Sequence, residues 1–219
     1  MARWAAWTGL LSLLAFGALT AFVVRSGSGI LPTDAPTLDW ALRNRPAAAL
    51  TAARALTSTG NGTVPYVLAA IAGALSARGL RGRLLSAAAF LAFLGAGQAL
   101  RYATMTLIAR PRPPVRDWAT HASGWSFPSG HTATAAITAG LLITAVLLRS
   151  PRGKRTAVAL IACWGASVGL TRPYLGVHWF TDVIGGWLFA VSWLSLGACL
   201  LLRLLPPRTP TVPAPAPSP

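Results

Sequence analysis

Residues 132–148 read TATAAITAGLLITAVLL, an uncharged and mostly apolar run that decides the class of the fold. A helix needs roughly 18 such residues to cross a bilayer, whereas a helix on a soluble core alternates apolar and polar faces. Over the whole chain 54% of residues are hydrophobic and only 11% are charged. A soluble domain usually carries about a quarter of charged residues, so the chain is predicted to lie in a membrane as one multi-helix domain.

Similar apolar runs on both sides of this stretch predict an all-α bundle of six transmembrane helices. The predicted spans are 7–24, 64–77, 84–109, 132–148, 157–170 and 178–202. The first run lacks a small-x-small cleavage site and is expected to be a retained span. In the fifth, Gly165 and Gly169 have a spacing that permits close helix packing. A short interfacial helix is expected over Ala47–Leu56.

The chain is predicted to consist of a folded membrane domain and an unfolded C-terminal tail. Residues 1–205 are predicted to form the membrane-embedded domain, and residues 206–219 a Pro-rich tail that is too poor in apolar bulk to fold.

The distribution of basic residues predicts the orientation in the membrane. With six spans, the loops alternate between the two sides of the membrane. Lys and Arg are more numerous on the side of the termini once Arg110, Arg112 and Arg172 are set aside as site residues. Cytoplasmic loops are enriched in Lys and Arg, so both termini are predicted to be cytoplasmic and the site extracytoplasmic.

The net charge of +15 comes from 19 Lys and Arg residues against 4 acids. In a chain this apolar, basic loops indicate membrane orientation and attraction to anionic head groups, so the bilayer is the expected partner and nucleic acid is not. Cys163 and Cys199 lie within apolar runs and indicate neither a disulfide framework nor a metal site. The acids on the outer side are too few and too scattered for a two-metal carboxylate site, so no metal or other cofactor is expected.

Residues on the outer side form a predicted anion site. Ser129, Gly130 and His131 stand at the start of the fourth span, where unpaired N–H groups and the positive end of the helix dipole attract phosphate. Arg112 and Arg172 supply fork-shaped donors that match phosphoryl oxygens and stay charged at any working pH.

A second feature of this side predicts a nucleophile. His178 and Asp182 are spaced i and i+4 and are expected to share one helix face. The carboxylate would then accept from one ring nitrogen and leave the other free to attack. His121 belongs to no such pattern and is predicted to be a solvated loop residue.

Three segments, Arg112-Pro113, Pro128-Ser129-Gly130-His131 and Arg172-x5-His178-x3-Asp182, resemble in order and spacing the three signature motifs of the type 2 phosphatidic acid phosphatase, or lipid phosphate phosphatase, superfamily. Two positions depart from the family pattern. Thr171 stands where the family has Ser, and Met105 stands where it has Lys.

The resemblance implies a mechanism for these residues. His178 attacks phosphorus and forms a phosphohistidine, Asp182 orients His178, and His131 protonates the leaving oxygen and then activates water. The phosphate-binding residues it implies are Arg112, Ser129, Gly130 and Arg172. Such groups would stabilise the charge on the equatorial oxygens during transfer.

The missing lysine leaves one positive charge to be supplied, and two arginines are candidates for phosphate binding in its place. Arg101 lies one helical turn before Met105 on the same face, and Arg110 lies in the following loop. Helical side chains tilt toward the helix N-terminus, which would direct Arg101 away from the site.

The resemblance implies an integral membrane phosphatase that acts on a phosphomonoester or diphosphate of a membrane lipid. Undecaprenyl diphosphate, phosphatidic acid and phosphatidylglycerol phosphate are the candidate substrates. A phosphotransferase with the same intermediate remains an alternative. A catalytically impaired protein that binds or transports a lipid phosphate is a further one, favoured by the missing lysine and opposed by the intact His131, His178 and Asp182.

Overall fold

Helices make up the regular structure of the chain. The computed structural model describes residues 2–27, 30–149 and 153–204, and the predicted tail over 206–219 lies outside these residues. Within the described ranges there are eight α-helices and no strand, which confirms the all-α class. In chain order the elements are α1 (Ala2–Arg25), α2 (Asp34–Arg43), α3 (Ala47–Ser58), α4 (Thr63–Ser76), α5 (Leu80–Ile108), the 3-10 helix η1 (Val115–Asp117), α6 (Gly130–Arg149), α7 (Lys154–Tyr174) and α8 (Phe180–Leu204).

Four of these helices, α1, α5, α6 and α8, are long and apolar enough to cross a membrane. Helix α4 is apolar but has 14 residues, and at 1.5 Å per residue it reaches about 21 Å, short of the roughly 30 Å hydrocarbon core. Helix α7 has 21 residues but is more polar, with Lys154 and Arg155 at its start and Arg172 near its end. A multi-pass arrangement is therefore supported, and the count of six spans stays a prediction.

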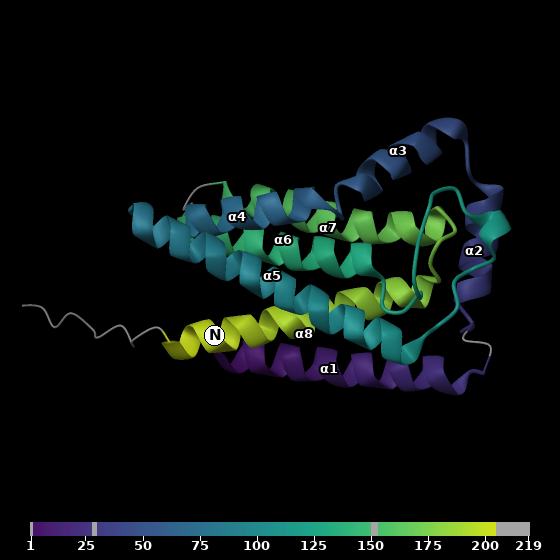
Figure 1. Cartoon of the computed structure of the whole chain (residues 1–219), viewed down its shortest axis with the longest axis horizontal. Helices are drawn as coiled ribbons and strands as arrows, with labels where there is room; N and C mark the ends of the chain where they lie inside the picture. Colours follow the sequence, from purple (N-terminus) through teal and green to yellow (C-terminus); the bar gives the residue numbers. More distant parts are fainter. Residues whose placement is uncertain (1, 28–29, 150–152, 205–219) are drawn as a thin grey trace, which may run out of the picture.

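The long helices run roughly along one axis, and the short elements α2 and η1 lie at one end of the bundle (Figure 1). The start of α1 and the end of α8 lie at the opposite end. Helix α1 packs along α8, while α6 packs against α4, α7 and α8 and forms the centre of the bundle. The end that carries α2, η1 and the segments 109–129 and 175–179 is called the loop end below.

Small residues let the central helices approach closely. A Cβ atom added at Gly165 of α7 would lie 2.9 Å from the Cβ of Ala139 on α6, and one added at Gly169 would lie 3.0 Å from Thr132 Cγ2. These separations leave no room for a larger side chain, so the close packing expected from the Gly-x-x-x-Gly spacing is confirmed.

The segment before α4 contains one helix that the sequence predicts and one that it does not. Helix α3 covers the expected 47–56 region. Helix α2 is short and mixes Asp, Pro, Thr and Arg with few apolar residues, so its own sequence specifies it poorly. Asp34, Leu38 and Ala41 are its buried residues, spaced as one helical face. Tertiary contacts on that face therefore fix α2 at the loop end.

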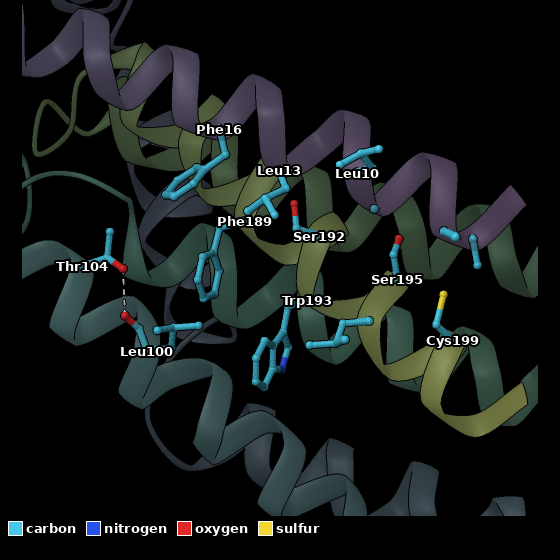
Figure 2. Close-up of a pocket in the computed structure, with 14 residues that line it drawn as sticks. Leu10, Leu13, Phe16, Leu100, Thr104, Phe189, Ser192, Trp193, Ser195 and Cys199 are labelled. Carbon is cyan, nitrogen blue, oxygen red and sulfur yellow. Dashed lines mark hydrogen bonds between the residues drawn. The ribbon is translucent and has the colours of Figure 1, made fainter. Parts of the chain in front are cut away.

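An apolar groove of about 410 Å³ lies between α5 and the α1–α8 pair (Figure 2). Leu13 and Phe16 of α1 line it together with Phe189 and Trp193 of α8, and Leu100 lines it from α5. Among the described residues none lines both this groove and the polar pocket at the loop end. The groove and the polar pocket are therefore separate features that share only α5.

Candidate active site

A polar pocket of about 460 Å³ lies at the loop end. Its walls come from α5, α6 and α7 and from the loop segments 121–125 and 175–179. Most of the residues singled out from the sequence line it: Arg101, Met105, Arg112, Gly130, His131, Arg172 and His178. Segments up to 117 residues apart in the chain, from Asn61 to His178, thus meet around one cavity.

His178 contacts Asp182, although not in the way that the spacing predicts. Helix α8 begins at Phe180, so His178 lies in the loop before it and the prediction of a shared helix face is wrong. His178 Nδ1 is nevertheless 3.2 Å from Asp182 Oδ2. The same oxygen accepts a hydrogen bond of 2.8 Å from the backbone N–H of Trp179. A carboxylate in the first helical turn that reaches back to the preceding backbone folds the loop over the helix start, and this brings His178 to Asp182.

Arg112 fixes the tautomer of His178. Arg112 Nη1 lies 2.9 Å from His178 Nε2. A guanidinium group can only donate, so Nε2 must accept, and the ring proton must lie on Nδ1, where it is donated to Asp182. The lone pair of Nε2 therefore lies on the side of Arg112, and this is the form of the ring that a nucleophile requires.

The surroundings of His178 keep its ring neutral. Burial lowers the pKa of His178 to about 4, against the opposing effect of the hydrogen bond to Asp182 and with the positive charge of Arg112 acting in the same direction as burial. A neutral imidazole at neutral pH retains the lone pair on Nε2.

Arg112 uses all of its donors within the protein. Its Nη1 donates to the carbonyl of Val177 as well as to His178, while Nε and Nη2 donate to the carbonyls of Gly124, Ser123 and Trp125. The contact with His178 is the one that a phosphoryl oxygen can replace without freeing a backbone carbonyl. Arg112 therefore orders the loop over the pocket and brings positive charge to Nε2 of His178.

Arg172 keeps a donor without a partner. The side chain is buried at 2% exposure, and its Nη1 donates to Thr57 Oγ1 of α3 at 2.9 Å. Its Nε is buried and has no hydrogen-bond partner. The same is true of Nε of Arg101 and Nε2 of Gln98, and both of these residues line the same pocket. Unpaired buried donors are costly, and three of them around one cavity are suited to an anionic ligand.

Arg101 reaches the pocket from α5. Its Nη1 lies 3.2 Å from the sulfur of Met105, one turn toward the C-terminus, so the side chain points against the usual tilt. A Cβ atom added at Gly130 would lie 3.3 Å from Arg101 Cζ. The guanidinium group therefore lies against the start of α6, next to Met105, the position at which the motif resemblance leads us to expect a lysine.

The start of α6 differs from the predicted row of free N–H groups. The N–H of Ser129 donates to the carbonyl of Asp182 at 3.1 Å, and Ser129 Oγ accepts from Thr132 at 2.9 Å. Ser129 is fully buried and does not line the pocket, so its predicted role as a phosphate ligand is not supported. It instead ties the start of α6 to the start of α8, which leaves Gly130 and His131 at the pocket wall.

Arg110 is also placed differently from the prediction. Its Nη1 forms an ion pair of 2.5 Å with Asp182 Oδ1, and its Nη2 forms one of 2.6 Å with Asp34 Oδ2 of α2. The side chain is 2% exposed and is not part of the pocket wall. A guanidinium group bound by two buried carboxylates is a poor phosphate ligand, and this contact is the physical reason for revising the prediction for Arg110.

Other pocket residues were not singled out from the sequence. Gln98 of α5 and Asn61 before α4 line the cavity, and so does His121, which is exposed as predicted but lies at the rim of the pocket. Behind His178, the hydroxyl of Ser126 donates to Asp182 Oδ2. Gln98 could have been identified from the sequence. It is an amide inside an apolar run and lies three residues before Arg101, a spacing that places both on one polar helix face.

The described residues contain no group of three or more His, Cys, Asp or Glu side chains placed to hold a metal ion. The carboxylates near the pocket are bound by Arg110, and Asp182 is occupied by His178.

Residues 84–205 match the profile of the PAP2 superfamily. The chain is 37% identical over 154 residues to the decaprenylphosphoryl-5-phosphoribose phosphatase of Mycolicibacterium smegmatis, an alignment that covers 67% of this chain and 75% of that protein. It is 34% identical over 88 residues to phosphatidylglycerophosphatase B of Escherichia coli (strain K12), which covers 40% of this chain. This alignment spans only about a third (34%) of the E. coli protein's own length.

One solved structure supports the fold as a whole. The crystal structure described as the first transmembrane PAP2 type phosphatidylglycerolphosphate phosphatase from Bacillus subtilis superposes with a TM-score of 0.79. The match covers 92% of this chain and 100% of that chain at 24% sequence identity. At this identity the likeness establishes the helical arrangement alone.

Proposed function

Because its residues 84–205 match that profile, this chain belongs to the PAP2 superfamily, and we propose that it is a membrane phosphatase that removes phosphate from a phosphorylated lipid. The arrangement around His178 carries the proposal. Its Nε2 lone pair lies beside Arg112, its Nδ1 is bonded to Asp182, and Arg172 lines the same pocket with an unpaired donor. An oriented nucleophile beside an anion site is what phosphoryl transfer requires.

In the proposed first step, Nε2 of His178 forms a bond to phosphorus while the bond between phosphorus and the lipid oxygen breaks. His131 gives a proton to that oxygen as it leaves. Asp182 holds Nδ1–H and stabilises the charge that develops on the ring. Arg101 and Arg172 donate to the equatorial oxygens, and Arg112 exchanges its contact with Nε2 for one with the phosphoryl group.

In the second step, water attacks phosphorus and the bond between phosphorus and Nε2 breaks. His131, now neutral, takes the proton of the water, which returns both histidines to their starting states and releases inorganic phosphate. Every proton in this cycle is carried by residues of the chain and by water.

The substrate class is proposed from the relatives and from the fold. The names of the M. smegmatis and E. coli proteins, and of the lipid A 1-phosphatase of Rhizobium etli (38% identical over 98 residues), describe phosphatases of phosphorylated lipids. The long apolar helices support a substrate that is itself held in the bilayer. Phosphatidylglycerol phosphate, phosphatidic acid, undecaprenyl diphosphate and a polyprenyl-linked sugar phosphate are the members of this class to test.

We also propose the orientation derived from the basic loops. Both termini, with the 206–219 tail, would lie in the cytoplasm, residues 1–205 would form the membrane domain, and the loop end would face the outside. The site would then act on lipids of the outer leaflet.

The direct test is phosphate release from these four lipids by the purified full-length chain, in detergent with EDTA present. We expect release from at least one lipid, persistence in EDTA, and inhibition by vanadate, which adopts the trigonal bipyramidal shape of the transfer. His178→Ala and His131→Ala should each lower kcat by orders of magnitude without unfolding the protein. With ³²P-labelled substrate, an acid-labile, alkali-stable phosphoprotein should be trapped in the wild type.

Absence of release from every lipid would overturn the proposed function. Release that depends on added magnesium, or that survives His178→Ala, would overturn the mechanism. A product in which the phosphoryl group is found on an added alcohol, with little inorganic phosphate, would favour the phosphotransferase reading.

A further inference from the structure

Asp34 is a buried carboxylate that the proposed mechanism does not use. It begins α2, is fully buried, and precedes the residues 84–205 that match the family. The chain contains only 4 acidic residues. A carboxylate is rarely buried unless it is paired, so the contacts of Asp34 reveal what it holds in place.

Asp34 binds two residues that adjoin Asp182: Arg110, which pairs with its carboxylate, and Thr181, which precedes it in the chain. Its Oδ2 forms the 2.6 Å ion pair with Arg110, whose other nitrogen holds Asp182 Oδ1. Its Oδ1 accepts from both the N–H and the hydroxyl of Thr181, each at 2.9 Å. The Thr181 hydroxyl in turn accepts from Arg110 Nη1 at 2.8 Å. Asp34 therefore fixes both the arginine that pairs with Asp182 and the residue next to Asp182 in the chain.

The two oxygens of Asp182 have separate partners. Oδ1 is held by Arg110, and Oδ2 accepts from His178, Trp179 and Ser126. An oxygen held on one side limits rotation of the carboxylate, and this determines the direction in which Oδ2 faces the ring of His178. The chain of contacts therefore runs from α2 through Arg110 to the proposed nucleophile.

We propose that Asp34 is a positioning residue, which acts through Arg110 and Thr181 to hold Asp182 in the orientation that presents Nε2 of His178. This inference rests on the proposed function and goes beyond it, because it assigns a catalytic requirement to a helix outside the family motifs. Without the Asp34 charge, Arg110 has one carboxylate instead of two and draws Asp182 away from the ring. The position of the imidazole then becomes variable.

The alternative is that Asp34 only attaches α2 to the bundle. An attachment role predicts lower thermal stability with normal turnover by the molecules that remain folded. A positioning role predicts lower kcat in fully folded protein, an almost unchanged KM, and loss of the effect once Asp182 is already impaired.

The experiment uses the full-length chain in detergent, with dioctanoyl phosphatidic acid, or the most active lipid of the panel, as the probe. Asp34→Asn keeps the shape of the side chain and removes its charge. We expect kcat to fall about tenfold to a hundredfold, as for other residues that orient a functional ligand through hydrogen bonds. Asp39→Asn, the same change at an exposed position of the same helix, should leave kcat unchanged.

A double-mutant cycle with Asp182→Asn separates the two roles. If Asp34 acts through Asp182, the kcat of Asp34→Asn/Asp182→Asn equals that of Asp182→Asn within about twofold. Independent, multiplicative losses would overturn the proposal, and so would normal kcat in folded Asp34→Asn. If Asp34→Asn does not fold, Arg110→Lys takes its place in the cycle, because an ammonium group cannot bind both carboxylates as the guanidinium fork does.

A spectroscopic readout keeps the inference separate from the proposed function. The chain has 3 histidines, so ¹⁵N-histidine spectra can be assigned by comparison with His178→Gln. In the wild type we expect the Nδ1–H tautomer of His178, and in Asp34→Asn a mixture of tautomers. An inactive wild type with this spectral change would overturn the proposed function and retain the positioning role. An unchanged spectrum in folded Asp34→Asn would overturn the positioning role whatever the activity.

Discussion

Arg112, Arg172 and Arg101 line one pocket but differ in what their N–H groups already bind. Arg112 is committed to four backbone carbonyls and to His178, whereas Arg172 and Arg101 each keep an unpaired Nε. A donor that needs no new desolvation on binding gives the larger gain in binding free energy. We therefore expect Arg172 and Arg101 to hold the phosphate, with Arg112 mainly supplying charge and loop order.

We predict that Arg101 supplies the positive charge of the lysine that the motif resemblance leads us to expect at position 105, where this chain has Met. Arg101→Ala should lower kcat/KM by ~1–3 kcal/mol, since it removes a charged donor from the anion site. Arg101→Ala/Met105→Lys should recover part of this loss, because the lysine would enter the same part of the pocket. The measurement is steady-state phosphate release by the purified variants.

Arg116→Ala provides the matched control, since this arginine side chain is 83% exposed and is not part of the pocket wall. It removes the same charge from the same end of the bundle and should change kcat/KM little. If Arg101→Ala is folded and as active as Arg116→Ala, Arg101 does not contact the phosphate.

The lowered pKa of His178 leads to a prediction for pH dependence. The ring must be neutral to attack, and its pKa lies near 4 rather than 6.5. The acidic limb of kcat/KM that belongs to His178 should therefore lie near pH 4, with activity retained at pH 5 to 6, where a free histidine would be largely protonated. A limb near pH 6.5 that does not follow the substrate's own ionisation, measured by ³¹P NMR, would contradict this prediction.

Among the secondary-structure elements, continuous apolar runs predict the long helices, whereas they do not predict the short helix α2. Each predicted apolar span coincides with a helix to within a few residues, namely α1, α4, α5, α6, α7 and α8, because each of these helices contains a continuous apolar run. Helix α2 lacked such a run and is held by buried contacts, including Asp34. Local sequence cannot specify a helix whose stabilising partners lie more than seventy residues away.

Some contacts of the candidate site can be predicted from the sequence, and others cannot. Pairing of His178 with Asp182 followed from their spacing, even though the loop geometry behind it did not. The ion pair of Arg110 with Asp34 and the bond from Ser129 to Asp182 depend on how three segments meet. Spacing within one segment identifies neighbours along a helix, but it does not show which charge in another segment will be paired.

Helix α3 supports the site from outside the predicted spans. Thr57 binds Arg172 in the pocket, and Arg54 donates to the carbonyl of Ala119 at 2.8 Å. On the preceding segment, Arg45 donates to the carbonyl of Asp117. These contacts hold the loop between α5 and α6 over the pocket, so the region between α1 and α4 is part of the site's framework.

The packing of α7 on α6 gives a prediction at this scale. Gly165→Leu would place side-chain atoms where Ala139 Cβ already lies, and overpacking of this kind costs about 1–3 kcal/mol of unfolding free energy. The thermal midpoint in detergent should fall. Because α7 carries Arg172, phosphate release should fall as well.

Gly17→Leu is the control for this substitution, because nothing lies within 4 Å of a Cβ atom added at Gly17 of α1. It should leave the thermal midpoint nearly unchanged. Combining Gly165→Leu with Ala139→Gly should restore part of the lost stability. A Gly165→Leu variant as stable as Gly17→Leu would show that the α6–α7 contact tolerates a wider separation.

For the whole molecule, the distribution of charge predicts which end faces the cytoplasm. Arg81 stands at the start of α5 and Lys154 at the start of α7, both at the end away from the pocket, whereas Asp117 lies in η1 at the loop end. Basic residues favour the cytoplasmic side, so the pocket is predicted to face outward.

Single cysteines at positions 81, 154 and 117 test this orientation, after the native Cys163 and Cys199 are both replaced by Ala. In intact cells, a membrane-impermeant thiol reagent should label the cysteine at 117 and spare those at 81 and 154. All three should react once the cells are permeabilised, which controls for accessibility. Labelling of 81 and 154 with protection of 117 would place the pocket in the cytoplasm, and labelling of only one of 81 and 154 would show that α5 and α7 do not start on the same side.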